Sequence, residues 1–140
     1  MKGWISGEVI GKPRGKQRAM VDTRWARPRH YTPAQTVDYE RQVKWAAAEA
    51  MRGRETLTGA VRMRLIIEIE PPTSWSAIKR LAALSGLIHP TVTPDYDNVA
   101  KAVSDGCNRI IYNDDKQICL STIYKKYSGT NRVRFFFKKL

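Results

Sequence analysis

The sequence predicts one α/β domain over residues 1–140, with a mixed four-stranded sheet and helices mainly on one side. First, the apolar period alternates between two and about 3.6 in the order strand, helix, strand, helix, helix, strand, strand. Second, 140 residues are enough for one core and too few for two ordinary domains. Third, neither repeats nor low-complexity segments divide the chain, so a single sheet with helices against it is the economical architecture.

The N-terminal part predicts a strand followed by a basic loop. Residues 3 to 10 alternate between apolar and polar positions, which is typical of a strand. Residues 12 to 29 hold seven basic residues against one acid, Asp22, and show no regular period, which predicts a long flexible loop. We expect this loop to bind a nucleic-acid backbone. Its basic residues are Lys12, Arg14, Lys16, Arg18, Arg24, Arg27 and Arg29.

The middle of the chain predicts a helix, a strand and a second helix. Thr36 is suited to cap a helix that runs to about Met51 with apolar residues at helical spacing. Residues 60 to 70 then alternate, which predicts a strand with one buried face. Ser74 is suited to open a shorter helix that ends near Leu84.

The C-terminal part predicts one more helix and two strands. The helix has an apolar stripe formed by Val99, Ala102, Val103 and Cys107. Residues 118 to 127 and 132 to 138 have the composition of strands. Because only four residues, Ser-Gly-Thr-Asn, separate these strands, the sequence predicts that they form a hairpin.

The overall charge indicates a polyanionic partner. Lys and Arg number 25 against 13 Asp and Glu, which gives a formal net charge of +12 and a pI near 10.1. Proteins with this imbalance usually bind phosphate or an anionic membrane. No segment approaches the roughly 18 apolar residues of a membrane span, so nucleic acid is the better interpretation. The N-terminus lacks the apolar core of a secretory signal, and we expect a cytoplasmic protein.

The cysteines and tryptophans give further expectations. Cys107 and Cys119 lack metal-ligand spacing, and the sequence favours two buried thiols in a reducing compartment over the alternative of a single disulfide. Trp4 and Trp45 occupy positions that predict core packing. Trp25, inside the basic loop, is a candidate either for stacking on an exposed base or for hydrophobic cover.

Four aspartates are grouped on either side of a predicted helix. Asp95 and Asp97 stand at its start, and Asp114 and Asp115 stand before the next strand. Acids grouped in so basic a chain repel one another unless they bind a cation, and Mg²⁺ prefers carboxylate oxygens. Ions held there would activate water and clamp a scissile phosphate. The pattern therefore predicts a metal site for phosphodiester hydrolysis, with Lys101 one turn further along to contact phosphate.

The same residues also have a structural interpretation. Asp95 or Asp97 can cap a helix, and Asp97 and Asp105 can each form an ion pair with Lys101 at a spacing of four. Asn-Asp-Asp at residues 113 to 115 is ordinary turn chemistry. Spacing alone leaves the metal site and the structural interpretation both open.

Several segments together resemble one known family, the RusA family of Holliday junction resolvases. In sequence order they are KPRGKQR at 12 to 18, HYTPAQTVDYE at 30 to 40, SWSAIKRLAALSG at 74 to 86, PDYDNVAK at 94 to 101, Asp105, and YNDDKQI at 112 to 118. The resemblance covers nearly the whole chain in the right order, which makes it far more specific than any one motif. Gln17, Ala19 and Gly106 depart from the family pattern, and none of these departures touches an acid.

The resemblance implies a small homodimeric endonuclease that cuts four-way DNA junctions by paired nicks, in DNA recombination and repair. It implies Mg²⁺ as the cofactor, with Mn²⁺ as a substitute. Asp95, Asp97 and Asp115 fall on the family's essential carboxylates, Lys101 on its lysine, and Asp114 on the acid beside the last one. Independently, two symmetric cuts call for two equivalent sites, which a two-fold dimer supplies.

Two other functions are consistent with the residues. A non-catalytic basic architectural protein would bind branched or duplex nucleic acid without cutting it, and its acids would serve as caps and ion pairs. A metal nuclease could instead act on RNA or on flaps. Cleavage of a labelled four-way junction, with and without a chelator, separates the architectural protein from a nuclease.

Overall fold

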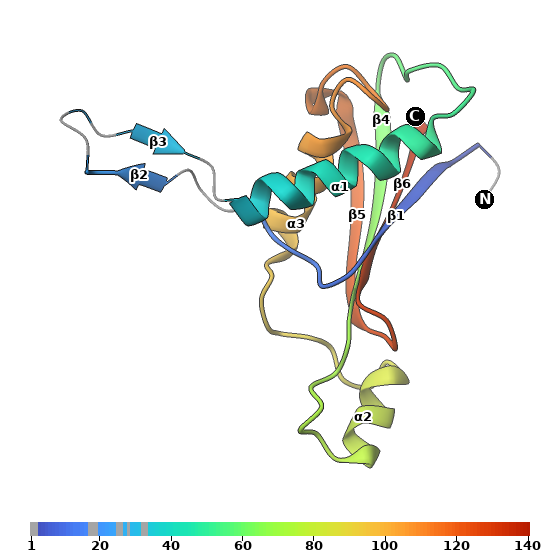
Figure 1. Ribbon diagram of the computed structural model, residues 1–140. Helices are drawn as coiled ribbons and strands as arrows, with labels where there is room; N and C mark the ends of the chain where they lie inside the picture. Colours follow the sequence, from blue (N-terminus) through green and yellow to red (C-terminus); the bar gives the residue numbers. More distant parts are fainter. Residues whose placement is uncertain (1–2, 17–19, 25–26, 28, 32–33) are drawn as a thin grey trace.

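A computed structural model of the chain describes residues 3–16, 20–24, 27, 29–31 and 34–140. Its main sheet has four strands in the order β1-β6-β4-β5, and a second sheet pairs β2 with β3 (Figure 1). The strands are β1 (Ile5–Ile10), β2 (Met20–Asp22), β3 (Arg29–Tyr31), β4 (Val61–Ile69), β5 (Ile118–Tyr127) and β6 (Arg132–Lys139). The helices are α1 (Ala34–Ala50), α2 (Ala77–Leu84), α3 (Tyr96–Cys107) and one turn of 3-10 helix, η1 (Asp115–Gln117). The predicted α/β class with a four-stranded sheet is confirmed.

The order of the strands differs from the predicted hairpin. β4 lies between the two C-terminal strands, so that β5 pairs with β4 in parallel and β6 pairs with β4 antiparallel. Residues 128–131 cross the end of β4, where Ser128 N donates to Ile69 O at 2.9 Å and Glu70 N donates to Asn131 Oδ1 at 2.8 Å. A short polar connection suits a hairpin and this crossing equally well. Only the pairing of β4, far away in the sequence, distinguishes the two.

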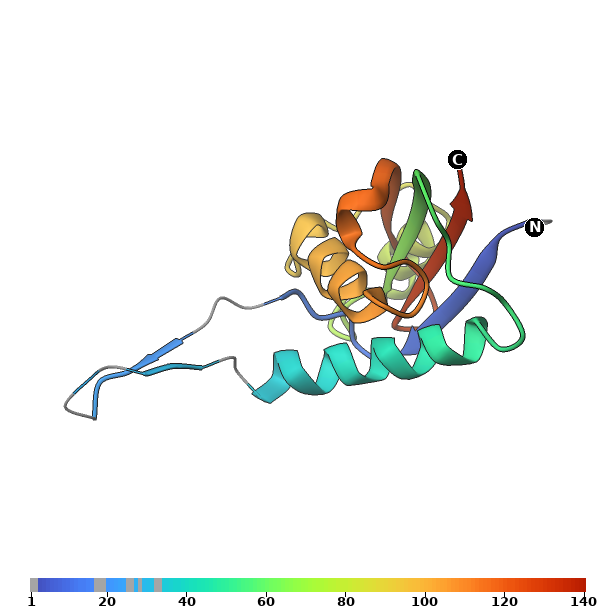
Figure 2. The same cartoon turned by 90° about the horizontal axis from the view of Figure 1, so that it is seen from above.

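One face of the sheet holds the core. Alternate residues of β4 and β6 are buried there, including Leu65, Ile67 and Phe135. α1 and α3 lie on this side (Figures 1 and 2), whereas α2 lies beyond the end of the strands (Figure 1). The predicted stripe of α3 is buried at every position, as are its neighbours on α1: Val43, Ala47, Val99, Ala102, Val103 and Cys107. The expectation of helices mainly on one side is confirmed.

Two helices begin at other residues than predicted. α1 begins at Ala34, so Thr36 lies inside the helix and is buried instead of capping it. α2 begins at Ala77, and its cap is Ser76, whose hydroxyl accepts a 3.2 Å hydrogen bond from Lys79 N, instead of Ser74. Periodicity locates a helix but not its first residue, because several nearby side chains can serve as the cap. The helices in the described part of the chain lack the length and apolar content that a bilayer span requires.

In its described part, the basic segment, residues 12–29, is more regular than the predicted loop. β2 and β3 pair antiparallel and form a two-stranded arm that projects away from the main sheet (Figures 1 and 2). Arg24 and Arg27 are exposed between these strands. Strands of three residues are too short to show a period in the sequence, which is why the arm was not predicted. Arg18 and Trp25 lie outside the described residues.

Three side chains predicted to be buried are accessible. Trp45 is 75% exposed on α1. Trp4 packs edge-on against Phe136 on the open face of the sheet, the face opposite α1 and α3, instead of in the core. Cys107 is buried as predicted, which raises the pKa of its thiol, but Cys119 is exposed and both thiols are free. A helical or strand period identifies the two faces of an element, and packing against other elements decides which face is covered.

Glu68 of β4 is a charged residue that is buried on the open face of the sheet, with 2% of its surface exposed. Arg134 Nη2 lies 3.2 Å from Glu68 Oε1, and Arg132 Nε also donates to the carboxylate. Burial alone would raise the pKa of Glu68, but Arg132 and Arg134 lower it below its usual value. A carboxylate with a depressed folded pKa stabilises the fold above its unfolded pKa of about 4.3, and this stability is lost as the pH falls through the folded pKa.

Glu68→Gln is therefore expected to lower the free energy of unfolding by about 2 kcal/mol near neutral pH, because two partly exposed guanidinium groups lose their carboxylate. Urea denaturation of both proteins should show this difference shrinking as the pH falls below about 4, where the wild type also loses its charge. Glu70→Gln, at an exposed position just beyond the strand, is the matched control and should change little. A difference that stayed constant down to acid pH would contradict the role assigned to the Glu68 charge.

Candidate functional site

The N-terminal end of α3 presents two of the predicted acids to solvent. Asp95 is the N-cap residue, but its side chain makes no capping hydrogen bond, and its Oδ2 accepts from Asn98 Nδ2 at 3.5 Å. Asp97 stands in the first turn, where the helix dipole stabilises a negative charge. Both residues are exposed, and the Asp97 side chain forms no hydrogen bond or ion pair within the described residues. Their carboxylate oxygens are therefore available to a ligand.

Asp95 and Asp97 line a groove of about 560 Å³, which we call the acidic groove. Residues 90–93 and Lys125 of β5 form other parts of its lining. The groove thus combines carboxylates with a cation at the edge of the sheet, a composition suited to a ligand that carries both phosphate and a metal ion.

Lys125 is a site residue that the sequence analysis missed. Its Nζ donates to Pro94 O at 2.9 Å and also to Val92 O, so it fixes the loop that leads into α3. The signal was present in the strand pattern: Ile123 and Tyr127, two residues away on either side, pack toward the core. A lysine at a position that should face the core indicates a specific polar partner.

Lys101 connects α3, whose N-terminal end bears Asp95 and Asp97, to η1, which bears Asp115. Its Nζ lies 3.1 Å from Asp105 Oδ1, one turn further along α3, and 3.2 Å from Asp115 Oδ2 in η1. Hydrogen bonds to Asp105 and Asp115 raise the pKa of Lys101, and burial opposes them only in part. Lys101 is therefore fully charged near neutral pH. Lys101 thus pairs with Asp115 across two elements, and it forms the Lys101–Asp105 pair of the structural interpretation.

Asp105 also anchors the basic segment. Lys16 Nζ bonds to Asp105 Oδ2 and lies 3.1 Å from Glu40 Oε1 of α1, while Lys16 N donates to Asn98 O at 2.9 Å. Burial would lower the pKa of Lys16, but Asp105 and Glu40 raise it. Lys16 was predicted to bind nucleic acid. In the structure its ion pairs with Glu40 and Asp105 connect its own segment to α1 and α3. No local pattern indicates this contact, because Lys16 and Asp105 lie 89 residues apart.

Asp114 has a local structural role. Its Oδ1 accepts from Lys116 N at 2.9 Å, and its backbone N–H donates to Gln117 Oε1 at 3.1 Å. These reciprocal bonds form a capping box at the start of η1. The Lys116 N–H also lowers the pKa of Asp114. Asp114 therefore fixes the turn that presents Asp115.

Two predicted nucleic-acid-binding residues border the loop before α3. Lys12 and Arg14 line a small groove of about 210 Å³ together with Thr93 and Pro94. Both basic residues are exposed, and Arg14 Nη1 donates to Gln35 Oε1 at 3.1 Å. Apart from Lys16, the other described basic residues of the segment are on the arm and exposed: Arg24, Arg27 and Arg29. A basic surface thus adjoins the acidic groove.

The available donors suit a hard divalent cation. Asp95, Asp97 and Asp115 offer carboxylate oxygens, the ligands that Mg²⁺ prefers. In the part of the chain that is described, no three His, Cys, Asp or Glu residues are grouped closely enough to hold a metal ion by themselves. Mg²⁺ keeps several waters and uses few carboxylates, and substrate phosphate commonly completes its shell. The donor set therefore fits an ion that binds together with its substrate.

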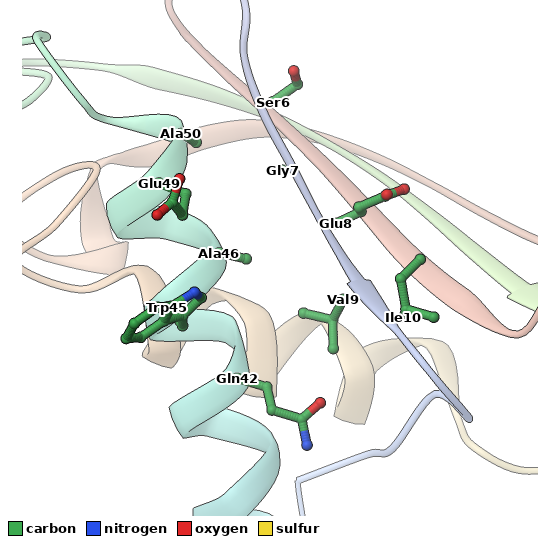
Figure 3. A pocket seen from close by; sticks show the side chains of 10 residues that line it. All are labelled: Ser6, Gly7, Glu8, Val9, Ile10, Gln42, Trp45, Ala46, Glu49 and Ala50. Atoms are coloured by element: carbon green, nitrogen blue, oxygen red, sulfur yellow. The ribbon is translucent and has the colours of Figure 1, made fainter.

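A second groove, of about 540 Å³, lies between β1 and α1 (Figure 3). Trp45 lines it, and the charged residues in its described lining are both acids, Glu8 and Glu49. Its described lining shares no residue with the groove at Asp95 and Asp97. This groove is therefore separate from the candidate site.

This chain is similar to known proteins over a range that includes all residues of the candidate site. The sequence profile of the family described as Endodeoxyribonuclease RusA matches residues 11–135. The uncharacterized protein YqaN of Bacillus subtilis (strain 168) is 31% identical over 138 residues, which cover 97% of this chain and 96% of that protein. The residues matched by the family profile include Asp95, Asp97, Lys101, Asp114 and Asp115.

Proposed function

The chain belongs to the RusA family of endodeoxyribonucleases, and from this premise we propose that it resolves four-way DNA junctions by paired, symmetric, Mg²⁺-dependent nicks. One observation supports the proposal above the others. Lys101 brings Asp115 of η1 against α3, the helix whose N-terminal end bears Asp95 and Asp97. Acids that are separated in the sequence are thereby presented by two adjoining elements beside a basic surface.

In this proposal Asp95, Asp97 and Asp115 supply carboxylate oxygens to one or two divalent ions, whose other ligands are water and substrate phosphate. Asp114 stands beside them as the cap of η1. The ion, Mg²⁺ or Mn²⁺, supplies a Lewis acid for phosphodiester hydrolysis. Lys101 contributes a fixed ammonium group that contacts a nonbridging phosphate oxygen or the developing charge. Its raised pKa keeps this group protonated, and the 3.1 Å ion pair with Asp105 positions it.

The DNA backbone follows the basic surface next to the acidic groove. Lys12 and Arg14 contact phosphates near the loop at Pro94, and the arm extends this surface through Arg24, Arg27 and Arg29. Lys16 contributes by holding the segment against α1 and α3. Arg18 belongs to the same segment but lies outside the described residues.

We also infer a homodimer that acts in the cytoplasm, in DNA recombination and repair. Two symmetric nicks need two equivalent sites, and a two-fold pair of subunits supplies them. Sedimentation of the free protein and of its junction complex tests this inference. A monomer in both samples would contradict it.

A substrate panel tests the function as a whole. Labelled four-way junction, fork, flap, duplex and RNA substrates are incubated with the protein in Mg²⁺ and, in parallel, with a chelator. We expect symmetric nicks in the junction at the highest rate and none with the chelator. Faster cutting of flaps or RNA would reassign the target. Tight junction binding without any cutting would instead favour the architectural protein, in which Asp105, Asp114 and Asp115 serve only as the caps and ion pairs described above.

A further inference from the structure

The open face of the main sheet, opposite α1 and α3, bears an ordered array of charged and aromatic side chains. Strand register places its outward-facing residues side by side across β1, β6, β4 and β5. Six basic residues stand there against two acids. The basic residues are Arg62, Arg64, Lys126, Arg132, Arg134 and Lys138, and the acids are Glu8 and Glu68. This face therefore has a strong local excess of positive charge.

The acids neutralise only one end of this face. The ion pairs there are those of Glu68 with Lys126, Arg132 and Arg134, and of Glu8 with Arg132. At the other end, Arg62 of β4 stands directly opposite Lys138 of β6. Neither Arg62 nor Lys138 forms an ion pair within the described residues. Two neighbouring cations thus lack a counter-charge.

Trp4 makes cation–π contacts with both Arg62 and Lys138. Lys138 Nζ lies 4.9 Å from the centre of the Trp4 ring, and Arg62 Cζ lies 5.6 Å from it. Phe136 meets the same indole edge-on, with ring centres 6.4 Å apart, and so fixes its orientation. A cation–π contact restrains a cationic side chain but leaves its charge unneutralised. In addition, Arg62 Nε is shielded from solvent and has no hydrogen-bond partner among the described residues.

We propose that the Trp4 cluster, Trp4 with Arg62 and Lys138, binds the phosphodiester backbone of DNA at a place separate from the acidic groove. Fixed cations without counter-charge favour an anion, and the choice of DNA rests on the proposed function. The cluster and α3 are on opposite faces of the sheet, so an arm of a junction held at the acidic groove leaves the cluster free for another arm. A second copy of the chain fits less well, because it would bring two positively charged faces together.

The test uses Arg62→Gln with Lys138→Gln in the full-length protein. Binding to labelled junction DNA is measured over a range of salt concentrations with a chelator present, so that no cleavage occurs. Each lost phosphate contact lowers the slope of log affinity against log salt by about 0.9, so the double variant should lose about 2 from the slope. Arg41→Gln with Arg52→Gln is the matched control: it removes the same charge from exposed positions on and just beyond α1, and should lower the slope by less than half as much.

The possible outcomes separate three explanations. A slope like that of the wild type, or equal losses in the double variant and its control, would overturn the proposal. Dissociation of a homodimer by the double variant in sedimentation would assign the cluster to the subunit interface and overturn it as well. Trp4→Leu keeps both charges but removes their support, and it should also weaken junction binding.

The binding test is independent of catalysis. Cleavage of the junction in Mg²⁺ is measured separately for the wild type and for Arg62→Gln with Lys138→Gln. Failure of the proposed function would appear instead as absence of cleavage by both proteins, while the difference in binding would remain.

Discussion

Asp97→Asn is expected to reduce junction cleavage by orders of magnitude, and Asp95→Asn and Asp115→Asn are expected to do the same. Asparagine keeps the size of the side chain but removes the charge that a hard divalent cation requires, so the metal-assisted activation of water is lost. Single-turnover cleavage of a labelled junction in Mg²⁺ measures the loss. Asp38→Asn, at an exposed position on α1, is the matched control and should cut normally.

Folding and binding of these variants distinguish a metal site from a structural one. Asp97 is exposed and unpaired within the described residues, so losing its favourable contact with the helix dipole should cost less than about 1 kcal/mol. Junction binding without metal should be preserved or improved, because one charge that repels phosphate has gone. Thermal melting and binding in a chelator measure both properties. Near-normal cleavage by all three variants would end the metal-site interpretation.

Gly106→Leu is expected to lower the free energy of unfolding by at least about 2 kcal/mol. A Cβ at residue 106 would lie 2.5 Å from Val43 Cγ1 and 2.7 Å from Val43 Cβ, where α3 crosses α1. Overpacking at such a contact typically costs about 1–3 kcal/mol and occasionally more. Leucine improves helix propensity over glycine by about 1 kcal/mol, which does not offset a clash with the body of the facing helix.

Urea denaturation of Gly106→Leu measures this cost. Gly129→Leu is the matched control, because a Cβ there meets no atom within 4 Å, and its stability should change little. A stability of Gly106→Leu equal to that of the wild type would show that α1 and α3 are not packed this closely. Cleavage should also fall, because Gly106 follows Asp105, which positions Lys101 on the same helix.

Local pattern was enough to predict most elements of this chain. Val61 to Ile69 alternate because one face of β4 packs on the core, and Val99, Ala102 and Val103 follow helical spacing because one side of α3 does the same. These patterns reflect the geometry of a few neighbouring residues and therefore survive in the sequence. The candidate site was found in the same way, since Asp95, Asp97 and Lys101 belong to one segment. Their roles in metal binding and catalysis remain predictions.

Contacts between distant residues decided the rest. The insertion of β4 between β5 and β6, the exposure of Trp45 and the bond of Lys16 to Asp105 each join or separate segments that no local period relates. Backbone geometry and amphipathic spacing are properties of short segments, so most strands and helices and the grouping of the acids could be predicted from the sequence. The pairing of the strands, the covered faces and the contacts between lysines and acids depend on the packing of the whole chain, so they became known only with the fold.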